Sequence, residues 1–281
     1  MCHTIHTFGY KLKRSFVSQY KVTRKEIIET LTAALRPLKY AYAFWESGSV
    51  SFNRMDQYSD IDLYMVTEDE RVEDAFSSME QNLADTFGIE LKYRLPEPTW
   101  HGHSQVFYRL QNTSPFLFLD IVVMKKSSQD KFLQYRIHQK PIIYFDKTGL
   151  VKDHPIDAGL FFKKLLSRLE TLKVTFDLFG VMTLKELNRG NDIEAFSYYL
   201  AYTYRPLVEA LRIKYCPYHY NFHNSYIYYD LPDETVKRLH ELNFVANAEE
   251  LRKRRSQAEV WFWEVVNSID PDDLRRNIQK K

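Results

Sequence analysis

The sequence contains little cysteine and no long apolar run, and each absence excludes a class of protein. Among its 281 residues only Cys2 and Cys216 are cysteines, too few for a disulfide framework or a cysteine-based zinc site. No stretch approaches the ~20 apolar residues that a transmembrane helix needs. The N-terminal residues lack the charged and apolar regions of a signal peptide. We therefore expect a soluble, reduced, cytoplasmic protein with no membrane partner.

An excess of charge of one sign is also missing. Lys and Arg number 39 against 37 acidic residues, which gives a net charge of +2, and residues 1–150 alone carry 19 basic and 18 acidic groups. A protein that binds nucleic acid usually presents a basic face. The charge balance therefore disfavours a nucleic-acid partner and leaves a small molecule or a protein. Nothing in the composition indicates the oligomeric state.

A glycine-serine turn follows the first predicted strand. Residues 39–45 are apolar or aromatic except for Lys39 at the start, and Glu46, Ser47, Gly48 and Ser49 break this pattern. Glycine lets the backbone approach a ligand closely, and a turn that opens into a helix offers free N–H groups to an anion. We predict that Gly48 and Ser49 hold the phosphates of a nucleotide.

Two carboxylates follow ten residues later, at the start of a strand predicted over residues 61–66. Asp60 and Asp62 are two residues apart, so on a strand they share one face. At about 5 Å they would repel by roughly 3 kcal/mol at an effective dielectric near 20. A cation between them removes this cost, and Mg²⁺ commonly binds one or two carboxylates plus substrate phosphates. The pattern favours a magnesium site, the alternative being a solvated loop or a helix cap.

Together these residues resemble the signature of the polymerase-beta-type nucleotidyltransferase superfamily: Gly48-Ser49, a spacer, then Ser59-Asp60-Ile61-Asp62-Leu63 and an apolar strand. One departure is Asn53, where many members carry a second glycine, although asparagine tolerates the left-handed conformation. The resemblance implies a nucleoside triphosphate bound with one or two Mg²⁺ ions, and Ser59 beside Gly48 and Ser49 at the nucleotide.

A third carboxylate lies in the apolar run 116–124. An Asp in such a run is rarely buried without a partner. The resemblance implies that an Asp from a later strand completes the metal site, and Asp120 fits this position. Asp120 is also a candidate for the base that takes the proton of the attacking hydroxyl. The alternative is a salt bridge from Asp120 to a nearby Lys or Arg.

The hydrophobic periodicity predicts an α+β protein: a small mixed β-sheet domain over residues 1–150, followed by an α-helical bundle of about five helices over 151–281. Thr23 and Glu26 form a capping box before a helix over 24–36, which Pro37 ends. Asn191 with Glu194 and Asn247 with Glu250 repeat the cap pattern, and Pro232 suits the first turn of another helix. Strands are predicted over 39–45, 61–66, 89–95, 105–110, 116–124 and 141–145, and a helix over 69–87.

The whole chain resembles the antibiotic adenylyltransferases that modify aminoglycosides or lincosamides, and the segment 56–60 is similar to the lincosamide group. This resemblance implies a nucleotide on the first domain and an acceptor between the two domains, with the bundle as the acceptor-binding domain. The predicted reaction is transfer of AMP from ATP, or of another nucleoside monophosphate, to a hydroxyl of a small-molecule acceptor, with release of pyrophosphate. The alternatives are adenylylation of a partner protein, and a nucleotide-binding module without transfer.

Several further residues allow two interpretations each. Ten tyrosines between residues 198 and 229 either form a stacking wall for the acceptor or belong to a core, and we favour the core. Glu194 and Glu209 are candidate general bases, but a cap and a helix-face charge explain them better. Candidate triphosphate contacts are Lys125, Lys126 and Arg205.

Two histidine patterns invite a functional interpretation. Arg212 and His219 resemble the ribonuclease motif of helical toxin domains, but Cys216-Pro217 interrupts the spacing. His101 and His103 suggest a metal, yet no third ligand is near, and an exposed loop is the better interpretation.

Overall fold

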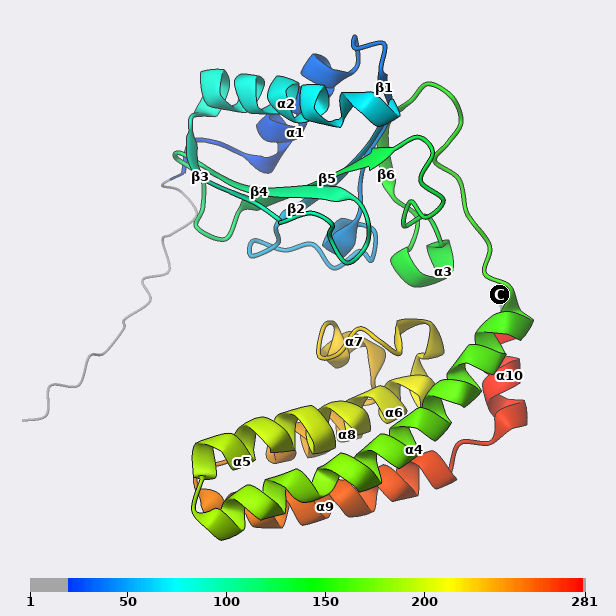
Figure 1. Ribbon diagram of the computed structural model, residues 1–281. Helices are drawn as coiled ribbons and strands as arrows, with labels where there is room; N and C mark the ends of the chain where they lie inside the picture. The colour runs from blue at the N-terminus through cyan, green and yellow to red at the C-terminus, as the bar shows by residue number, and fades with distance from the viewer. Residues whose placement is uncertain (1–19, 280–281) are drawn as a thin grey trace, which may run out of the picture. The chain divides into compact units, whose positions relative to one another are not determined.

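The computed structural model describes residues 20–279, so Cys2 and the N-terminal segment discussed above lie outside the described residues. The chain divides into two compact units between Pro155 and Ile156, five residues beyond the predicted boundary. The first unit combines a sheet with helices and the second is helical (Figure 1). The predicted α+β class is confirmed. Within residues 20–279 no helix has both the length and the apolar character needed to cross a bilayer.

The first unit is built on one six-stranded mixed sheet. In it β2 and β5 are parallel and all other neighbouring strands are antiparallel. The strands are β1 (Ala41–Glu46), β2 (Ile61–Thr67), β3 (Ile89–Arg94), β4 (Ser104–Leu110), β5 (Phe118–Lys125) and β6 (Ile142–Asp146), in the order β3-β4-β5-β2-β1-β6. Each predicted strand is present, with ends shifted by at most two residues.

Two helices, α1 (Arg24–Leu35) and α2 (Val72–Phe87), cover one face of this sheet (Figure 1). The predicted capping box starts α1, since Thr23 and Glu26 exchange hydrogen bonds, and the helix ends two residues before Pro37. The apolar stripes of both helices pack on alternate strand residues. The buried cluster includes Ile27, Leu31, Leu35, Phe76, Met79, Leu83, Ile61, Leu63, Val106 and Ile121.

The opposite face of the sheet is only partly covered. A smaller buried cluster lies there. It is formed by residues of β1, β2 and β5 and by the segment that contains α3 (Tyr135–His138). Its members are Ala43, Trp45, Val66, Val122, Met124, Leu133 and Val151. Asp62 and Asp120 point to this same face, because they alternate with the helix-facing Ile61, Leu63 and Ile121.

The second unit contains α4 (Ala158–Arg189), α5 (Asp192–Tyr199), α6 (Arg205–Tyr215), α7 (Ile227–Asp230), α8 (Asp233–Asn243), α9 (Ala248–Asn267) and α10 (Pro271–Gln279). A π-helical turn over Leu200–Tyr204 joins α5 to α6 without a break. Phe176 of α4 stacks on Phe262 of α9 with ring centroids 3.8 Å apart. Of the ten tyrosines, Tyr199 and Tyr204 lie in this core, whereas Tyr228 and Tyr229 are exposed.

Of three local predictions in this unit, one is confirmed and two need correction. Asn247 does cap α9, with its side chain accepting a hydrogen bond from the Glu250 amide. Asn191 precedes α5 but does not cap it, because its Nδ2 donates instead to the buried Glu186 at 2.8 Å. Pro232 stands just before α8 instead of in its first turn.

Candidate active site

Three of the predicted carboxylates lie beside each other at the start of two central strands. Asp62 on β2 is paired with Asp120 on β5 in the parallel ladder, so their side chains occupy neighbouring positions on one face. Asp60 comes two residues before Asp62, at the mouth of β2. The register therefore brings together residues that are 58 positions apart in the sequence.

The glycine turn is packed directly against this pair. Gly48 begins a short 3-10 helix of one turn, Gly48–Val50, and has a φ of +65°. A Cβ atom at this position would overlap the carboxylate of Asp62, so the close approach requires glycine. The Ser47 amide donates to the Asp62 carbonyl at 3.0 Å. Thus the turn and the carboxylates form one site.

The two predicted serines differ in what they contact. The Ser49 hydroxyl is buried and has no hydrogen-bond partner within the part of the chain that the structure describes. Such a group is costly unless a ligand completes it. The Ser59 hydroxyl instead donates to Asp56 Oδ1 at 3.1 Å and accepts from the Asp56 amide at 2.9 Å. It would have to give up these bonds to reach a nucleotide.

Burial and mutual repulsion raise the pKa values of two of the carboxylates. Burial, followed by the charges of Asp60 and Asp120, raises the pKa of Asp62 to about 7. Burial raises the pKa of Asp120 to about 6, although a hydrogen bond from Gln105 acts to lower it. The alternative of a salt bridge from Asp120 is not found among residues 20–279, where its side-chain partner is Gln105. A bound cation would relieve these costs.

The donor set suits magnesium in its chemistry. It offers hard carboxylate oxygens, and the orphaned Ser49 hydroxyl lies in the neighbouring turn. Among the described residues no three His, Cys, Asp or Glu side chains are already arranged to hold a metal ion. Mg²⁺ does not need such a cage, since it usually keeps water and phosphate in several of its six positions.

A buried network behind the carboxylates was not predicted. Arg24, the first residue of α1, donates through Nη1 to the Asp60 carbonyl at 2.5 Å and through Nη2 to Glu46. The Tyr144 hydroxyl also donates to Glu46, whose side chain is 2% exposed. This network fixes the position of Asp60 and places a positive charge behind it.

We expect Glu46→Gln to lower the free energy of unfolding by about 2 kcal/mol, because the partly buried Arg24 loses the charge of its buried partner. Glu29→Gln is the matched control. Its ion pair with Lys25 is exposed on both sides and should contribute less than about 0.5 kcal/mol. Urea denaturation of both variants measures the difference, and equal losses would contradict the assigned role.

A second unpredicted feature supports Asp120 from β4. Gln105 donates to Asp120 Oδ1 at 2.6 Å and its amide oxygen lies 2.9 Å from His101 Nε2. The His103 amide donates to His101 Nδ1 at 3.1 Å, so His101 is held as the tautomer that carries its proton on Nε2. The chain from His101 through Gln105 thereby sets the orientation of the third carboxylate.

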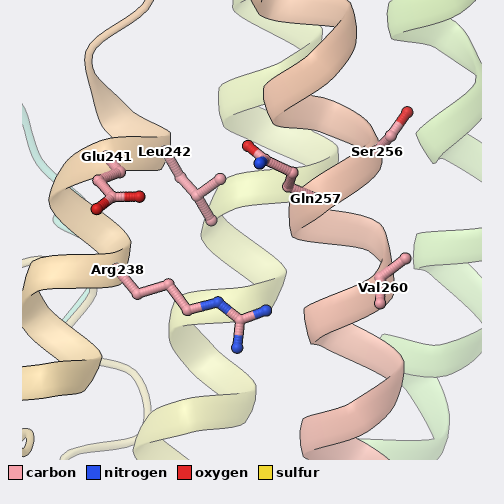
Figure 2. Close-up of a pocket in the computed structure, with 6 residues that line it drawn as sticks. All are labelled: Arg238, Glu241, Leu242, Ser256, Gln257 and Val260. Carbon is pink, nitrogen blue, oxygen red and sulfur yellow. The ribbon is translucent and has the colours of Figure 1, made fainter.

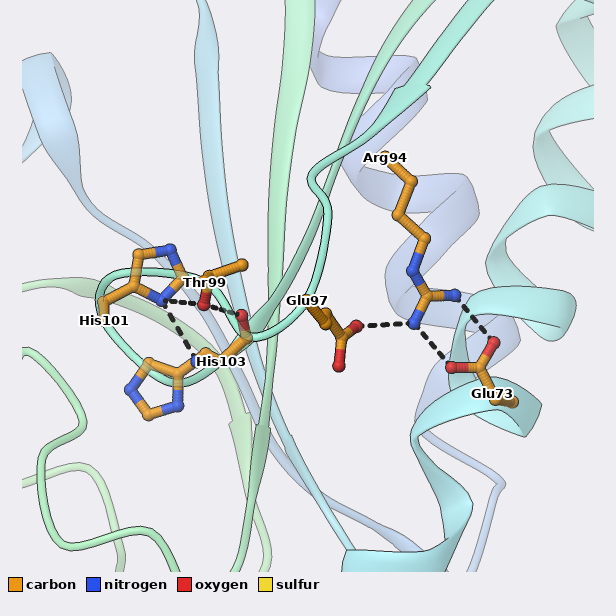
Figure 3. Close-up of polar contacts among 6 residues, drawn as sticks. All are labelled: Glu73, Arg94, Glu97, Thr99, His101 and His103. Atoms are coloured by element: carbon orange, nitrogen blue, oxygen red, sulfur yellow. Dashed lines mark hydrogen bonds and ion pairs between the residues drawn. The ribbon is translucent and has the colours of Figure 1, made fainter.

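The loop that carries these histidines is fixed at both ends (Figure 3). At one end Arg94 pairs with Glu73 of α2 at 2.5 Å and with Glu97 at 2.8 Å. At the other end the Thr99 hydroxyl donates to the His103 carbonyl at 2.6 Å. The prediction of an exposed loop is wrong for His103, which is 6% exposed, and burial lowers its pKa.

Other candidates are placed away from this chemistry or already have partners. Lys125 is the last residue of β5 and Lys126 follows it, roughly 16 and 20 Å along the strand from Asp120. Glu209 forms a two-point ion pair with Arg168, at 2.5 and 2.8 Å. Arg212 is fully buried and bonded to Asp230 at 3.0 Å, which excludes the ribonuclease interpretation because the guanidinium cannot reach a substrate.

A surface depression of about 360 Å³ lies in the second unit, between α8 and α9 (Figure 2). Arg238 projects into it and stacks over the Trp261 ring, 4.1 Å from the ring centroid. The residues that line the depression are Arg238, Glu241, Leu242, Ser256, Gln257 and Val260. None of them belongs to the predicted nucleotide site.

Comparison with protein families and with curated proteins found no match for this sequence. Among solved structures, an aminoglycoside 6-adenyltransferase from Bacillus subtilis is 12% identical, over 93% of this chain and 100% of that one, with a TM-score of 0.34. A STING-associated CdnE c-di-GMP synthase from Capnocytophaga granulosa is 15% identical, over 91% and 79%, with a TM-score of 0.29. A tRNA-processing enzyme is 15% identical, over 93% and 78%, with a TM-score of 0.35. With its glycine-serine turn and its Asp-Ile-Asp strand start, the chain resembles the polymerase-beta-type nucleotidyltransferases.

Proposed function

We propose that this protein transfers a nucleoside monophosphate, with AMP from ATP as the first candidate, to a hydroxyl of a small-molecule acceptor. Pyrophosphate is the second product. The observation that carries the proposal is the row of Asp62 and Asp120 packed against the Gly48 turn. It combines a turn that can bind phosphates with two carboxylates on adjacent strands that form no ion pair within residues 20–279.

The residues of the site divide into two groups. Gly48 and Ser49 bind the terminal phosphates, through the amides of the turn and the buried Ser49 hydroxyl. Asp60, Asp62 and Asp120 would hold one or two Mg²⁺ ions, which supply charge neutralisation at the transferring phosphate when bound. Arg24 and Gln105 position the carboxylates without touching the substrates.

The transfer itself requires one bond to form and one to break. The acceptor oxygen attacks the α-phosphorus, and the bond from that phosphorus to the bridging oxygen of pyrophosphate breaks on the opposite side. We assign to Asp120 the proton that leaves the hydroxyl. Gln105 holds Asp120 Oδ1 at 2.6 Å and the ladder position of Asp120 places it beside Asp62, so a carboxylate oxygen is available at the reacting centre to accept that proton. We assign acceptor binding in part to the second unit, residues 156–281.

The first test is calorimetric titration of wild type with α,β-methylene ATP, with and without magnesium. We expect binding that depends on magnesium, because the phosphates and the carboxylates otherwise repel each other. The same titration with GTP, CTP and UTP identifies the preferred base. No binding of any triphosphate would contradict the proposal. Binding without transfer to any small molecule, or transfer to a polypeptide detected by mass spectrometry, would favour a binding module or a protein acceptor.

A further inference from the structure

The carboxylates are the end of a longer row that crosses four strands. Tyr93 of β3 pairs with Phe107 of β4, Phe107 pairs with Asp120 of β5, and Asp120 pairs with Asp62 of β2. Paired residues share a face, so the two aromatic rings lie on the face that bears the carboxylates. The rings of Tyr93 and Phe107 stack at 6.3 Å with an angle of 18°.

A second row runs beside the first. Leu91 pairs with Arg109, and Arg109 with Phe118, which stands two residues before Asp120 on the same strand face. We call Leu91, Tyr93, Phe107 and Phe118 the aromatic shelf. Leu91 is 55%, Tyr93 58% and Phe118 38% exposed.

The shelf does not face the helices. The alternate residues of β3 do so, since Lys92 pairs with Glu80 and Arg94 with Glu73, both on α2. Exposed apolar side chains that are contiguous, and not scattered, usually mark a binding surface. Here that surface adjoins the candidate active site without a gap in the row.

The position of the shelf matches the direction from which an acceptor must come. The leaving pyrophosphate is bound at the Gly48 turn, which touches Asp62 from one side. In-line displacement requires the attacking oxygen on the side opposite to the leaving group. Phe107 lies one strand beyond Asp120 on that side and Tyr93 two strands beyond, at about 5 and 10 Å.

The chemistry of the shelf indicates the class of acceptor. Besides the carboxylates of the candidate active site, the charged residue in the two rows is Arg109, which forms an ion pair with Glu90 at 2.9 Å. The four shelf side chains are uncharged and the neighbouring Glu90 is paired with Arg109, so they offer a polycationic sugar no carboxylate of their own, whereas a flat ring would stack on Tyr93 and Phe107. We propose that the aromatic shelf binds the ring-bearing part of the hydroxyl acceptor, so that the enzyme selects acceptors with an apolar or aromatic ring. This inference rests on the proposed function.

The test compares two glucosides, 4-nitrophenyl β-D-glucoside and methyl β-D-glucoside. They share the sugar and differ in the group attached to it, which is an aromatic ring in the first and a methyl group in the second. Each is titrated against wild type without nucleotide and followed by saturation-transfer NMR. We expect the nitrophenyl probe to bind at least about fivefold more tightly than the methyl probe, and Tyr93→Ala and Phe118→Ala to remove most of that preference. Both side chains are at least 38% exposed, so the variants should fold. Phe244→Ala, at a 63% exposed ring of the second unit, is the control and should bind like wild type.

Equal binding of the two probes to wild type, or an unchanged preference in Tyr93→Ala, would overturn the proposal. So would a wild-type dimer in size-exclusion chromatography that Tyr93→Ala dissociates, because the shelf would then be a contact between copies. The outcome is independent of the nucleotide. A shelf that binds rings in a protein that binds no triphosphate would refute the proposed transfer and leave the ring site standing.

Discussion

Replacing Asp62 by Asn is expected to weaken magnesium-dependent binding of α,β-methylene ATP by about a hundredfold, close to 3 kcal/mol, and to abolish transfer. Asp62 lies between Asp60 and Asp120 and touches the Gly48 turn, so in the proposed function it is the carboxylate that meets both the metal and the phosphates. Asparagine keeps the shape of the side chain but removes the charge that a divalent cation requires. Calorimetry with and without magnesium measures the loss.

The same variant is expected to be more stable than wild type when magnesium is absent. The unfolded carboxyl ionises near its usual pKa of 3.8, and the folded one near 7. Between these values the folded state holds more protons, so the free energy of unfolding of wild type falls as the pH rises. Asp62→Asn lacks this fall. Its advantage should be small near pH 4 and reach about 4 kcal/mol at pH 8.

Asp85→Asn is the control for both measurements, because Asp85 lies on α2 and accepts hydrogen bonds from Gln81 of the same helix. It should change neither the nucleotide affinity nor the pH dependence of stability. Magnesium should raise the melting temperature of wild type and of Asp85→Asn, but not that of Asp62→Asn. Unchanged magnesium-dependent binding in Asp62→Asn would show that the metal, if bound, lies elsewhere.

The sequence predicts the strands and the carboxylate pair because both depend on short-range patterns. Strand alternation is a period of two, and Asp60 and Asp62 are neighbours in that period. Arg24 and Gln105 were not predicted, because their contacts join residues that are far apart in the sequence. Arg24 reaches Asp60 across 36 residues and Gln105 reaches Asp120 across 15. Only the packing of α1 and the register of β4 with β5 bring these side chains to the site.

Lys125 shows how proximity in sequence misleads within a strand. It follows Asp120 by five residues, but an extended chain carries it roughly 16 Å away and turns it to the other face. Asn191 shows the same limit in a helix. The cap pattern is present, yet the buried Glu186 offers a better partner for the side chain. Competing tertiary contacts, which a local pattern does not contain, decided both cases.

Replacing Gly48 by Ala is expected to reduce magnesium-dependent nucleotide binding by at least about tenfold and to lower the free energy of unfolding by more than about 2 kcal/mol. Two causes add. The φ of +65° is unfavourable for alanine, and the new Cβ overlaps the Asp62 carboxylate, so either the turn or Asp62 must move. Calorimetry and urea denaturation measure the two effects.

Gly149→Ala separates the two causes, because Gly149 has nearly the same φ, +68°, with no atom within 4 Å of the added Cβ. Its cost should be the backbone term alone, about 1 kcal/mol, with nucleotide affinity unchanged. The excess loss in Gly48→Ala then measures how closely the Gly48 turn and the Asp62 carboxylate are packed. If Gly48→Ala behaves like Gly149→Ala in both measurements, that contact is irrelevant to binding, and the turn and the carboxylates are not one site.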